Sequence, residues 1–254
     1  MSRRARISVC GYYHVYNRGV AKNKIFLSDL DKEKFLEILA EVSRDYKFNI
    51  HSFCLMDNHY HLLLENKKEN LSDGMRQLNS KYAKYFNIKY DRIGHFWQDR
   101  FKSWYIMRDK YLFTLFKYIE TKPLRAGMSK KVGEYKYCAI YSILRDAIPF
   151  FLRNSFVLRD YHTIELFKML NTPLSSDELE SIKELKKTKY KIKDNQILKQ
   201  RTKIDDYFVQ VVNKLERNKA ILQAFNDDFT KSEIARKLDM SVAGISKIIR
   251  KFED

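Results

Sequence analysis

Hydrophobic residues in the first half of the chain follow two spacings, every second position and every third or fourth position. The first spacing is typical of a strand with one buried face, and the second is typical of an amphipathic helix. In chain order, the predicted elements are a strand over residues 12–17, a helix over 29–46, strands over 49–56 and 59–65, a helix over 71–86, a strand over 101–107 and a helix that begins at Asp109. This β-α-β-β-α-β order with an added helix predicts an α+β domain of the ferredoxin-like class.

His59 and His61 lie two residues apart on the third predicted strand, directly after the short hairpin turn Asp57-Asn58. Side chains two apart on a strand project from the same face, so both imidazoles can bind one metal ion. A His-x-His pair alone is common, and two structural histidines are an equally simple interpretation. The pair therefore predicts a metal site only in combination with other motifs.

Three further blocks accompany the histidine pair: Asn-Arg-Gly at 17–19, Gly-His-Phe-Trp-Gln-Asp-Arg-Phe-Lys-Ser at 94–103, and Tyr-Ile-Glu-Thr-Lys-Pro-Leu-Arg-Ala-Gly at 118–127. The last block begins at the end of a helix-like stretch that Pro123 stops, about one turn after Tyr118. Taken together, the motifs resemble those of the REP-associated tyrosine transposases and of the wider single-strand insertion-sequence transposases of the HUH endonuclease superfamily. The resemblance runs from about Tyr12 to Ser142.

This resemblance implies a ferredoxin-like fold and a metal-dependent reaction on single-stranded DNA. His59 and His61 would bind the divalent metal, Mg²⁺ or Mn²⁺, and Tyr118 would attack a DNA phosphate to form a 5′-phosphotyrosyl adduct with a free 3′-hydroxyl. Tyr111, about two helical turns earlier on roughly the same face, is an alternative nucleophile. In the family the tyrosine acts in its own subunit or in its partner's, usually within a dimer, so a homodimer is expected.

Lys122 departs from the family motif, in which the position four residues after the tyrosine is asparagine or glutamine and can complete the metal shell. An ammonium cannot coordinate a metal cation, so Lys122 does not supply the third protein ligand of the metal. Water can fill the position, and Gln98, Asp57 and Glu65 are other candidates. Alternatively, Lys122 marks a chain that has lost or weakened its nuclease activity and acts as a DNA-binding regulator.

Basic residues exceed acidic ones, with 49 Lys and Arg against 32 Asp and Glu in 254 residues, for a net charge of +17. Such an excess favours a polyphosphate partner through counterion release. Within the motif region, Arg18, Arg100, Lys102 and Arg125 are the candidate DNA-binding residues, although ordinary surface cations are the simpler interpretation. The 17 Tyr and 17 Phe offer faces on which unpaired bases stack, although most of them are expected in the core.

Motifs that the sequence lacks disfavour several classes of protein. The chain has no Gly-x-x-x-x-Gly-Lys-Ser/Thr loop for ATP, and no apolar run of the roughly 20 residues needed to span a bilayer. A signal-type apolar core does not follow the first residues. Cys10, Cys54 and Cys138 are widely separated and form no Cys-x-x-Cys pair, as is typical of buried thiols in a reducing compartment. We therefore expect a cytoplasmic protein with no membrane partner.

The last third of the chain has a different pattern. Residues 172–203 are polar and rich in lysine, which predicts a solvated helix or linker. Residues 231–250 resemble a bacterial helix-turn-helix, in which Asp239 replaces the customary turn glycine. Thr230 and Ser241 are the expected N-caps of the two helices.

DNA contacts from the second of these helices are expected at Ser246, Lys247 and Arg250. Further helices over about 204–225 would complete a three-helix unit. A small helical bundle used for dimerisation is the alternative interpretation.

The sequence thus predicts three parts: a HUH-type tyrosine transposase domain over residues 1–145, a helical extension and basic linker over 146–203, and a helix-turn-helix DNA-binding domain over 204–254. The predicted function is metal-dependent cleavage and rejoining of single-stranded, hairpin-bearing DNA, with duplex DNA as a second partner of the helix-turn-helix. A catalytically weakened DNA-binding regulator is the alternative. Replication-initiator or relaxase activity shares this chemistry but is disfavoured by the single motif tyrosine.

Overall fold

The computed structural model describes residues 8–107, 110–187, 189–193, 196–200, 204–209, 211–226 and 229–252. The chain forms two compact units, Met1–Thr188 and Lys189–Asp254, and each unit has its own cluster of buried apolar side chains. Every described helix is too short or too polar to cross a membrane. The division into 1–145, 146–203 and 204–254 stays a prediction.

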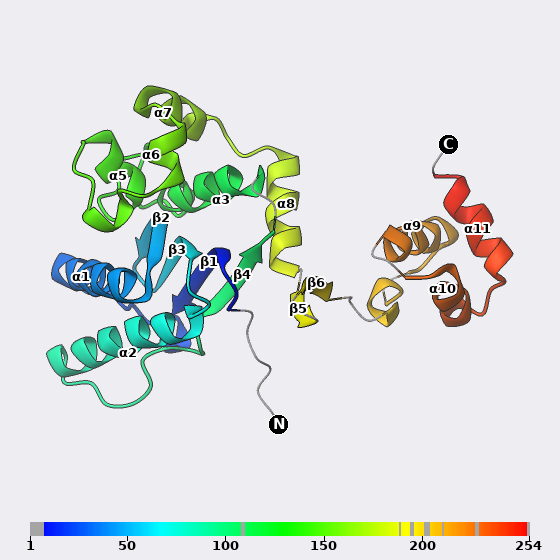
Figure 1. Ribbon diagram of the computed structural model, residues 1–254, viewed down its shortest axis with the longest axis horizontal. Coiled ribbons are helices and arrows are strands. Elements are labelled where there is room, and N and C mark those ends of the chain that lie inside the picture. Colours follow the sequence, from blue (N-terminus) through cyan, green and yellow to red (C-terminus); the bar gives the residue numbers. More distant parts are fainter. Residues whose placement is uncertain are drawn as a thin grey trace. The chain divides into compact units, whose positions relative to one another are not determined.

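The first unit is built on a four-stranded antiparallel sheet (Figure 1). Its strands are β1 Gly11–Arg18, β2 Phe48–Met56, β3 His59–Asn66 and β4 Lys102–Ile106, in the order β2-β3-β1-β4. Met56 pairs with His59 across the two residues Asp57-Asn58, so the predicted hairpin is confirmed. Because β3 lies between β2 and β1, the histidine pair stands on a central strand, as expected.

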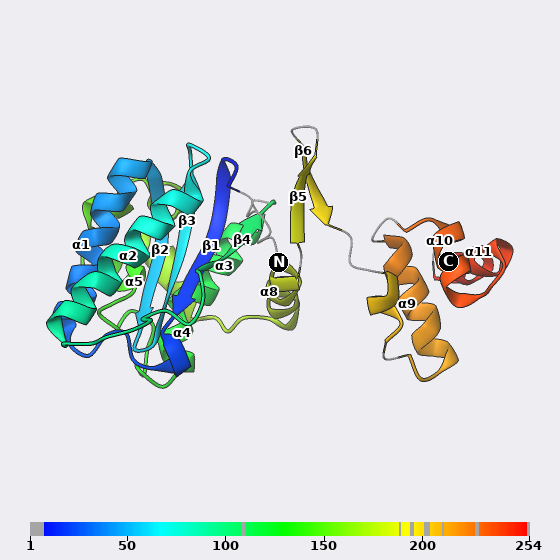
Figure 2. The same ribbon diagram turned by 90° about the horizontal axis from the view of Figure 1, so that it is seen from below.

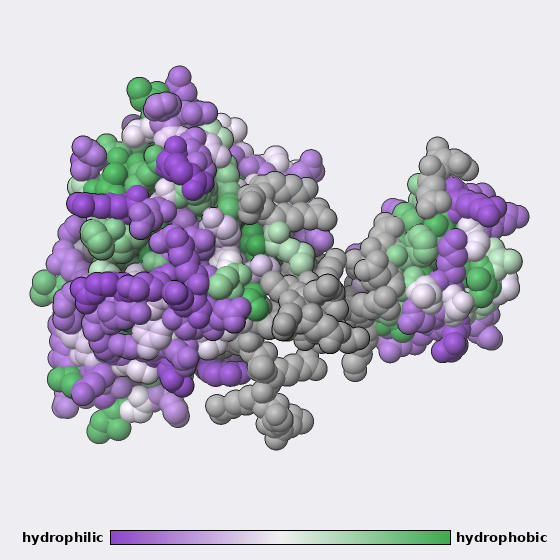
Figure 3. Space-filling model, in the orientation of Figure 1, coloured by the Kyte–Doolittle hydropathy of each residue, from purple (hydrophilic) through white to green (hydrophobic). Residues whose placement is uncertain are grey.

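Helices cover both faces of this sheet. α1 Asp29–Tyr46 and α2 Leu71–Lys89 pack against each other on one face, and α3 Lys110–Glu120 packs against β2 and β3 on the other (Figure 2). Further helices are α4 Lys122–Arg125, α5 Ala139–Leu144, α6 Phe156–Asp160, α7 Thr163–Asn171 and α8 Ser176–Lys187, with 3₁₀ turns at Val20–Lys22 and Phe150–Leu152. On the face that Figure 3 shows, the surface of this unit is largely hydrophilic. The predicted mixed α/β architecture is confirmed, and the elements from β1 to α3 follow the predicted order.

The alternation along β3 separates the two faces of the sheet. Tyr60 points to α1 and α2, where its ring lies 4.8 Å from that of Phe35 and its hydroxyl donates to Asn79 Oδ1 at 3.0 Å. His59 and His61, one residue to either side, face the opposite layer. The period of two therefore decides which side chains of β3 join the core under α1 and α2 and which form a site.

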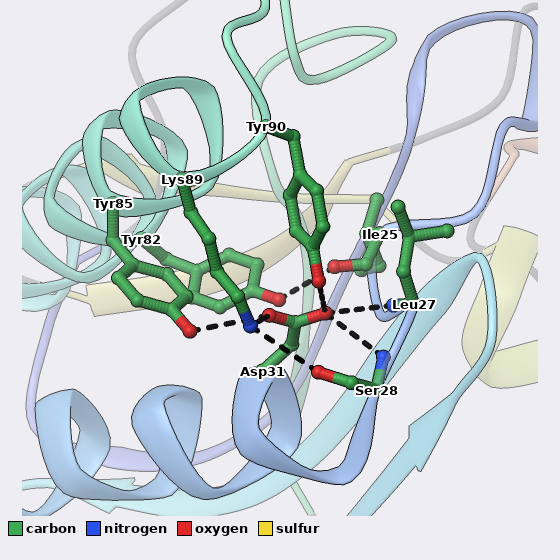
Figure 4. Close-up of polar contacts among 8 residues, drawn as sticks. All are labelled: Ile25, Leu27, Ser28, Asp31, Tyr82, Tyr85, Lys89 and Tyr90. Atoms are coloured by element: carbon green, nitrogen blue, oxygen red, sulfur yellow. Dashed lines mark hydrogen bonds and ion pairs between the residues drawn. The ribbon is translucent and has the colours of Figure 1, made fainter.

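A buried carboxylate connects the start of α1 to the end of α2 (Figure 4). The side chain of Asp31 is fully buried and accepts hydrogen bonds from Lys89 Nζ at 2.6 Å and the Tyr90 hydroxyl at 2.8 Å. The backbone N–H groups of Leu27 and Ser28 donate to it at 2.8 and 3.0 Å. Burial disfavours the charged form, but these donors outweigh it and hold the pKa of Asp31 below its usual value.

Replacing Asp31 by asparagine is expected to lower the free energy of unfolding by about 2–3 kcal/mol at pH 7, because the charge that these donors face is lost. Since the folded-state pKa of Asp31 is lowered, its contribution is present above the unfolded-state pKa and is lost as the pH falls through the folded-state value. Urea unfolding measures the change. Asp73→Asn is the matched control, because Asp73 is an exposed acid of α2 paired with Arg76 at 2.9 Å. Equal losses of unfolding free energy in the two variants would show that the buried charge of Asp31 stabilises the fold no more than an exposed carboxylate does.

The lysine-rich segment after residue 172 differs from its prediction. Ile182 and Leu185 of α8 are buried, and the helix packs against α3 and β4, so it is not a fully solvated helix. Beyond it, β5 Lys189–Lys193 and β6 Gln196–Gln200 form an antiparallel hairpin where a helix or linker was expected. The reason is visible in the sequence spacing, since lysines alternate with tyrosine and isoleucine in β5, which is strand periodicity.

The second unit contains the helices α9 Lys214–Asn226, α10 Lys231–Leu238 and α11 Val242–Arg250, preceded by a 3₁₀ turn at Ile204–Tyr207. Thr230 Oγ1 accepts from Glu233 N at 3.1 Å and Ser241 Oγ accepts from Gly244 N at 3.1 Å, so both predicted N-caps are confirmed. Asp239 adopts the left-handed conformation, with a φ of 52°, in the turn between α10 and α11. A DNA-binding role for this unit stays a prediction.

Candidate functional site

Three histidines meet on the sheet face that carries α3. His59 and His61 both project there from β3, with their ring centroids 5.0 Å apart and their planes nearly perpendicular. His14 of β1 joins them, because its Nε2 lies 2.9 Å from His61 Nδ1 and the two rings stack. The sequence predicted the pair but gave His14 no role. The pairing of β1 with β3 explains the contact. Tyr16 pairs with His61, and His14, two residues before Tyr16, lies on the same face of the sheet.

The environment of these histidines suits metal ligation. Burial, and then the nearby charges of Lys122 and Arg18, lowers the pKa of His59 to about 4, so this imidazole is neutral at physiological pH. The contact between His14 and His61 requires one nitrogen to donate and the other to accept, which couples the tautomers of the two rings and holds the direction of the His61 ring. Metal-binding histidines are commonly oriented in this way through their second nitrogen.

Tyr118 of α3 faces this cluster. Its ring centroid lies 6.5 Å from that of His14, in an edge-to-face arrangement. Lys122 Nζ donates to the Tyr118 hydroxyl at 3.4 Å, and Arg125 Nη2 donates to the Tyr118 carbonyl oxygen at 2.9 Å. Both cations also lie over the ring, 4.5 and 4.4 Å from its centroid. Tyr111 lies seven residues earlier, roughly 10 Å along the helix, so the structure brings Tyr118 rather than Tyr111 to this point.

Lys122 directly follows a break in the helix that carries Tyr118. α3 ends at Glu120, and the short helix α4 begins at Lys122 with Pro123 in its first turn, so the predicted stop at Pro123 comes three residues early. Proline is tolerated in a first turn because its missing N–H has no partner there in any case.

Two of the other proposed third ligands have side chains that are engaged elsewhere. Asp57 pairs with Lys24 at 3.2 Å, and Glu65 accepts from Asn49 at 2.8 Å. Gln98, in the loop before β4, lines a small cavity together with Tyr16 and Arg18, so it stays a candidate ligand. Within the described ranges, no group of three or more His, Cys, Asp or Glu side chains is placed to hold a metal. The two imidazoles of β3 would therefore need their remaining ligands from water, substrate or Gln98 to complete a metal site.

Three of the predicted DNA-binding cations come together beside the histidines. Arg18, Arg100 and Lys102 line a cavity of about 180 Å³ at the end of β1 and the start of β4. Tyr16, whose ring lies 5.6 Å from that of His61, lines the same cavity. Arg125 stands at Tyr118 instead. The cavity is therefore a candidate phosphate site next to the histidine cluster.

The remaining predicted contacts belong to the second unit. Ser246, Lys247 and Arg250 lie on α11, where the two cations are exposed and Ser246 is partly buried. Their role is not tested by this arrangement and stays a prediction.

Residues 8–122 match the model of the family described as IS200-like transposases. These residues belong to the IS200-like transposase family. The family predicted from the sequence motifs is thereby confirmed, and the matched segment contains the histidine cluster, Tyr118 and Lys122. No curated protein matches the chain.

Two solved structures resemble part of this chain. One is titled as the structure of a REP-associated tyrosine transposase bound to a REP hairpin; it is 18% identical, covers 59% of this chain and 89% of its own, and gives a TM-score of 0.49. The other, titled a "putative transposase" from Deinococcus radiodurans R1, is 12% identical, covers 58% of this chain and 98% of its own, and gives a TM-score of 0.34.

A buried acid lies two residues after the tyrosine of the transposase domain. Glu120 accepts from the Ser52 hydroxyl at 2.5 Å and from Ile140 N at 2.8 Å, so it connects α3 to β2 and α5. Burial raises the pKa of Glu120 to about 7. The carboxyl therefore holds the end of α3, and with it Tyr118, against the sheet.

Replacing Glu120 by glutamine is expected to flatten the pH dependence of stability. Because the folded-state pKa of about 7 lies above the ordinary value of 4.5, the stabilisation is fully present below pH 4.5 and is lost as the pH rises through 7. Between pH 4.5 and 8 the unfolding free energy of the wild type should fall relative to that of Glu120→Gln by on the order of 3 kcal/mol.

Denaturant unfolding across this range measures the effect, with Glu165→Gln, an exposed glutamate of α7, as the matched control. A difference between the wild type and Glu120→Gln that stays constant with pH would show that the carboxyl does not titrate in this range.

Proposed function

We propose that this chain is a DNA transposase in which Tyr118 cleaves and rejoins single-stranded DNA through a 5′-phosphotyrosine intermediate. The observation that carries the proposal is the Tyr118 hydroxyl, held by Lys122 at 3.4 Å beside three histidines in an IS200-like transposase domain. We include in the proposal the ferredoxin-like frame, for which the strand order and the two helices on one face are the support.

In the proposed reaction the Tyr118 oxygen attacks phosphorus, an O–P bond forms, and the bond from phosphorus to the 3′-oxygen breaks. The tyrosine loses one proton and the departing 3′-oxygen gains one, so no oxidant, reductant or nucleotide cofactor is required. A phenol is a weak nucleophile at neutral pH, and the ammonium of Lys122 stabilises the developing phenolate. The phosphotyrosine conserves the energy of the phosphodiester, so a 3′-hydroxyl rejoins the strand by the reverse step.

His59 and His61 would hold a divalent metal, Mg²⁺ or Mn²⁺, in this proposal. When bound, the metal supplies positive charge that polarises the scissile phosphate. The support from the chain itself is the neutral state of His59 and the orientation of His61 by His14.

The proposed substrate is hairpin-bearing single-stranded DNA. Arg18, Arg100, Lys102 and Arg125 would contact its phosphates, and the net charge of +17 favours such a partner. Ser246, Lys247 and Arg250 of α11 would contact duplex DNA, and a homodimer is the proposed assembly.

A second candidate function is a DNA-binding regulator that keeps the fold without the cleavage. The specific observation in its favour is Lys122, which stands where the family has a metal-binding carboxamide. The two candidates differ in one product, since only the enzyme forms a covalent bond to DNA.

Denaturing gel electrophoresis tests the proposal directly. The purified protein is mixed with labelled single-stranded oligonucleotides from the DNA flanking its gene, with Mn²⁺ or with EDTA. A metal-dependent, denaturant-resistant adduct is the expected result. Tight binding of the same oligonucleotides without any adduct would favour the regulator.

A further inference from the structure

Lys122 is a position at which the chain departs from the family motif, and its surroundings suggest a use for it. We infer that Lys122 is a catalytic residue whose ammonium binds the same phosphate that Tyr118 attacks. The inference rests on the proposed role of Tyr118 as the nucleophile. It replaces the view that a lysine at this position marks a loss of activity.

Geometry is the first argument. An attacking oxygen approaches phosphorus to about 3–3.5 Å before bond formation, and the non-bridging phosphate oxygens lie one bond beyond that phosphorus. Lys122 Nζ is already 3.4 Å from the Tyr118 hydroxyl. A phosphate placed for attack by Tyr118 therefore brings an oxygen within hydrogen-bonding reach of Nζ, with no movement of the backbone.

The charge of Lys122 is the second argument. Lys117, one residue before Tyr118, is buried and pairs with Glu178 of α8 at 3.4 Å, so its charge is neutralised within the fold. In the described ranges, Lys122 forms no ion pair with a carboxylate, and its hydrogen bond goes to the Tyr118 hydroxyl. Lys122 is partly buried all the same. A bound phosphate is the group that would compensate this charge.

Surrounding groups favour an anion at this point. Arg125 lies 4.4 Å from the Tyr118 ring centroid and adds a second positive charge. Burial lowers the pKa of Lys122, whereas a phosphate beside it would favour the ammonium form. An ammonium offers three donors to a phosphate as a compact charge. Lys122 would therefore act on the phosphate directly.

Binding of modified DNA tests this contact without any cleavage. In a Tyr118→Phe background and in EDTA, oligonucleotides are compared in which each linkage in turn is an uncharged methylphosphonate. At one linkage, loss of the phosphate charge is expected to weaken binding about tenfold or more when Lys122 is present, and to have no effect in the Lys122→Gln variant.

Lys131→Gln is the matched control, because Lys131 is an exposed lysine in the loop after α4. At every linkage, the Lys131→Gln variant should lose as much affinity as the Tyr118→Phe parent does. The inference is overturned if, at every linkage, the methylphosphonate weakens binding no more in the protein with Lys122 than in the Lys122→Gln variant.

Adduct formation with Tyr118 intact gives a second readout. Lys122→Gln is expected to slow it at least tenfold, and Lys122→Arg, which keeps the charge, should recover part of the rate. Adducts formed at the wild-type rate by Lys122→Gln, without coupling at any linkage, would overturn the inference and leave the proposed function intact. If the methylphosphonate weakens binding at one linkage only when Lys122 is present, but no adduct forms, the phosphate contact would be supported and the transposase activity refuted.

Discussion

Replacing Tyr118 by phenylalanine is expected to abolish the covalent protein–DNA adduct, lowering its rate of formation by about 10³-fold or more. The substitution removes only the hydroxyl, so the ring keeps its place against His14 and its contacts with Lys122 and Arg125. Binding of single-stranded DNA should therefore change by no more than a few-fold. Quantitative gels under single-turnover conditions measure the rate, and fluorescence anisotropy measures the affinity.

Two other tyrosines serve as matched controls for this result. Tyr16 lies 5.6 Å from His61 by ring centroids and lines the cationic cavity, and Tyr111 precedes Tyr118 by two turns of α3. Tyr16→Phe and Tyr111→Phe should both still form the adduct. Adduct formation that survives Tyr118→Phe and is lost in either control would move the nucleophile to that residue.

Removal of the metal is expected to lower adduct formation by about 10²-fold, and His59→Ala should produce a similar loss. Because both changes act on one site, the loss caused by His59→Ala should disappear when EDTA is present. His59 is preferred to His61 for this test, because His61 is bonded to His14 in the buried part of the cluster and its removal would also disturb packing.

His95→Ala is the control for a non-specific effect of losing an imidazole, since His95 is exposed in the loop before β4. Its adduct formation should match that of the wild type in both conditions. Full activity in EDTA, or a His59→Ala loss of equal size with and without the chelator, would show that the histidines do not act through a metal.

The sequence by itself determined most of the secondary structure from β1 to α3. The predicted helix over 29–46 coincides with α1, and the four predicted strands differ from the observed ones by at most one residue at each end. These elements follow from hydrophobic periodicity and from local caps and turns, which are properties of neighbouring residues. The lysine-rich segment after residue 172 shows the limit, because lysine content was given more weight there than the alternation that forms β5.

The family was also accessible from the chain, since the motifs that contain His59, His61 and Tyr118 resemble those of known transposases. The spatial relation of these three residues could not be predicted from the sequence. Tyr118 reaches the histidine cluster because α3 packs across β2 and β3, a contact between segments more than 40 residues apart.

Tertiary structure alone decided the role of His14 and the surroundings of Lys122. His14 carries no motif, and it meets His61 only because β1 pairs with β3 in one particular register. From the sequence, Lys122 is interpreted as a missing ligand, whereas in the structure its Nζ lies at the hydroxyl of Tyr118, the proposed nucleophile. Periodicity fixes the face on which a side chain lies, but the packing of strands and helices distant in sequence fixes which groups share that face, and a reaction depends on those groups together.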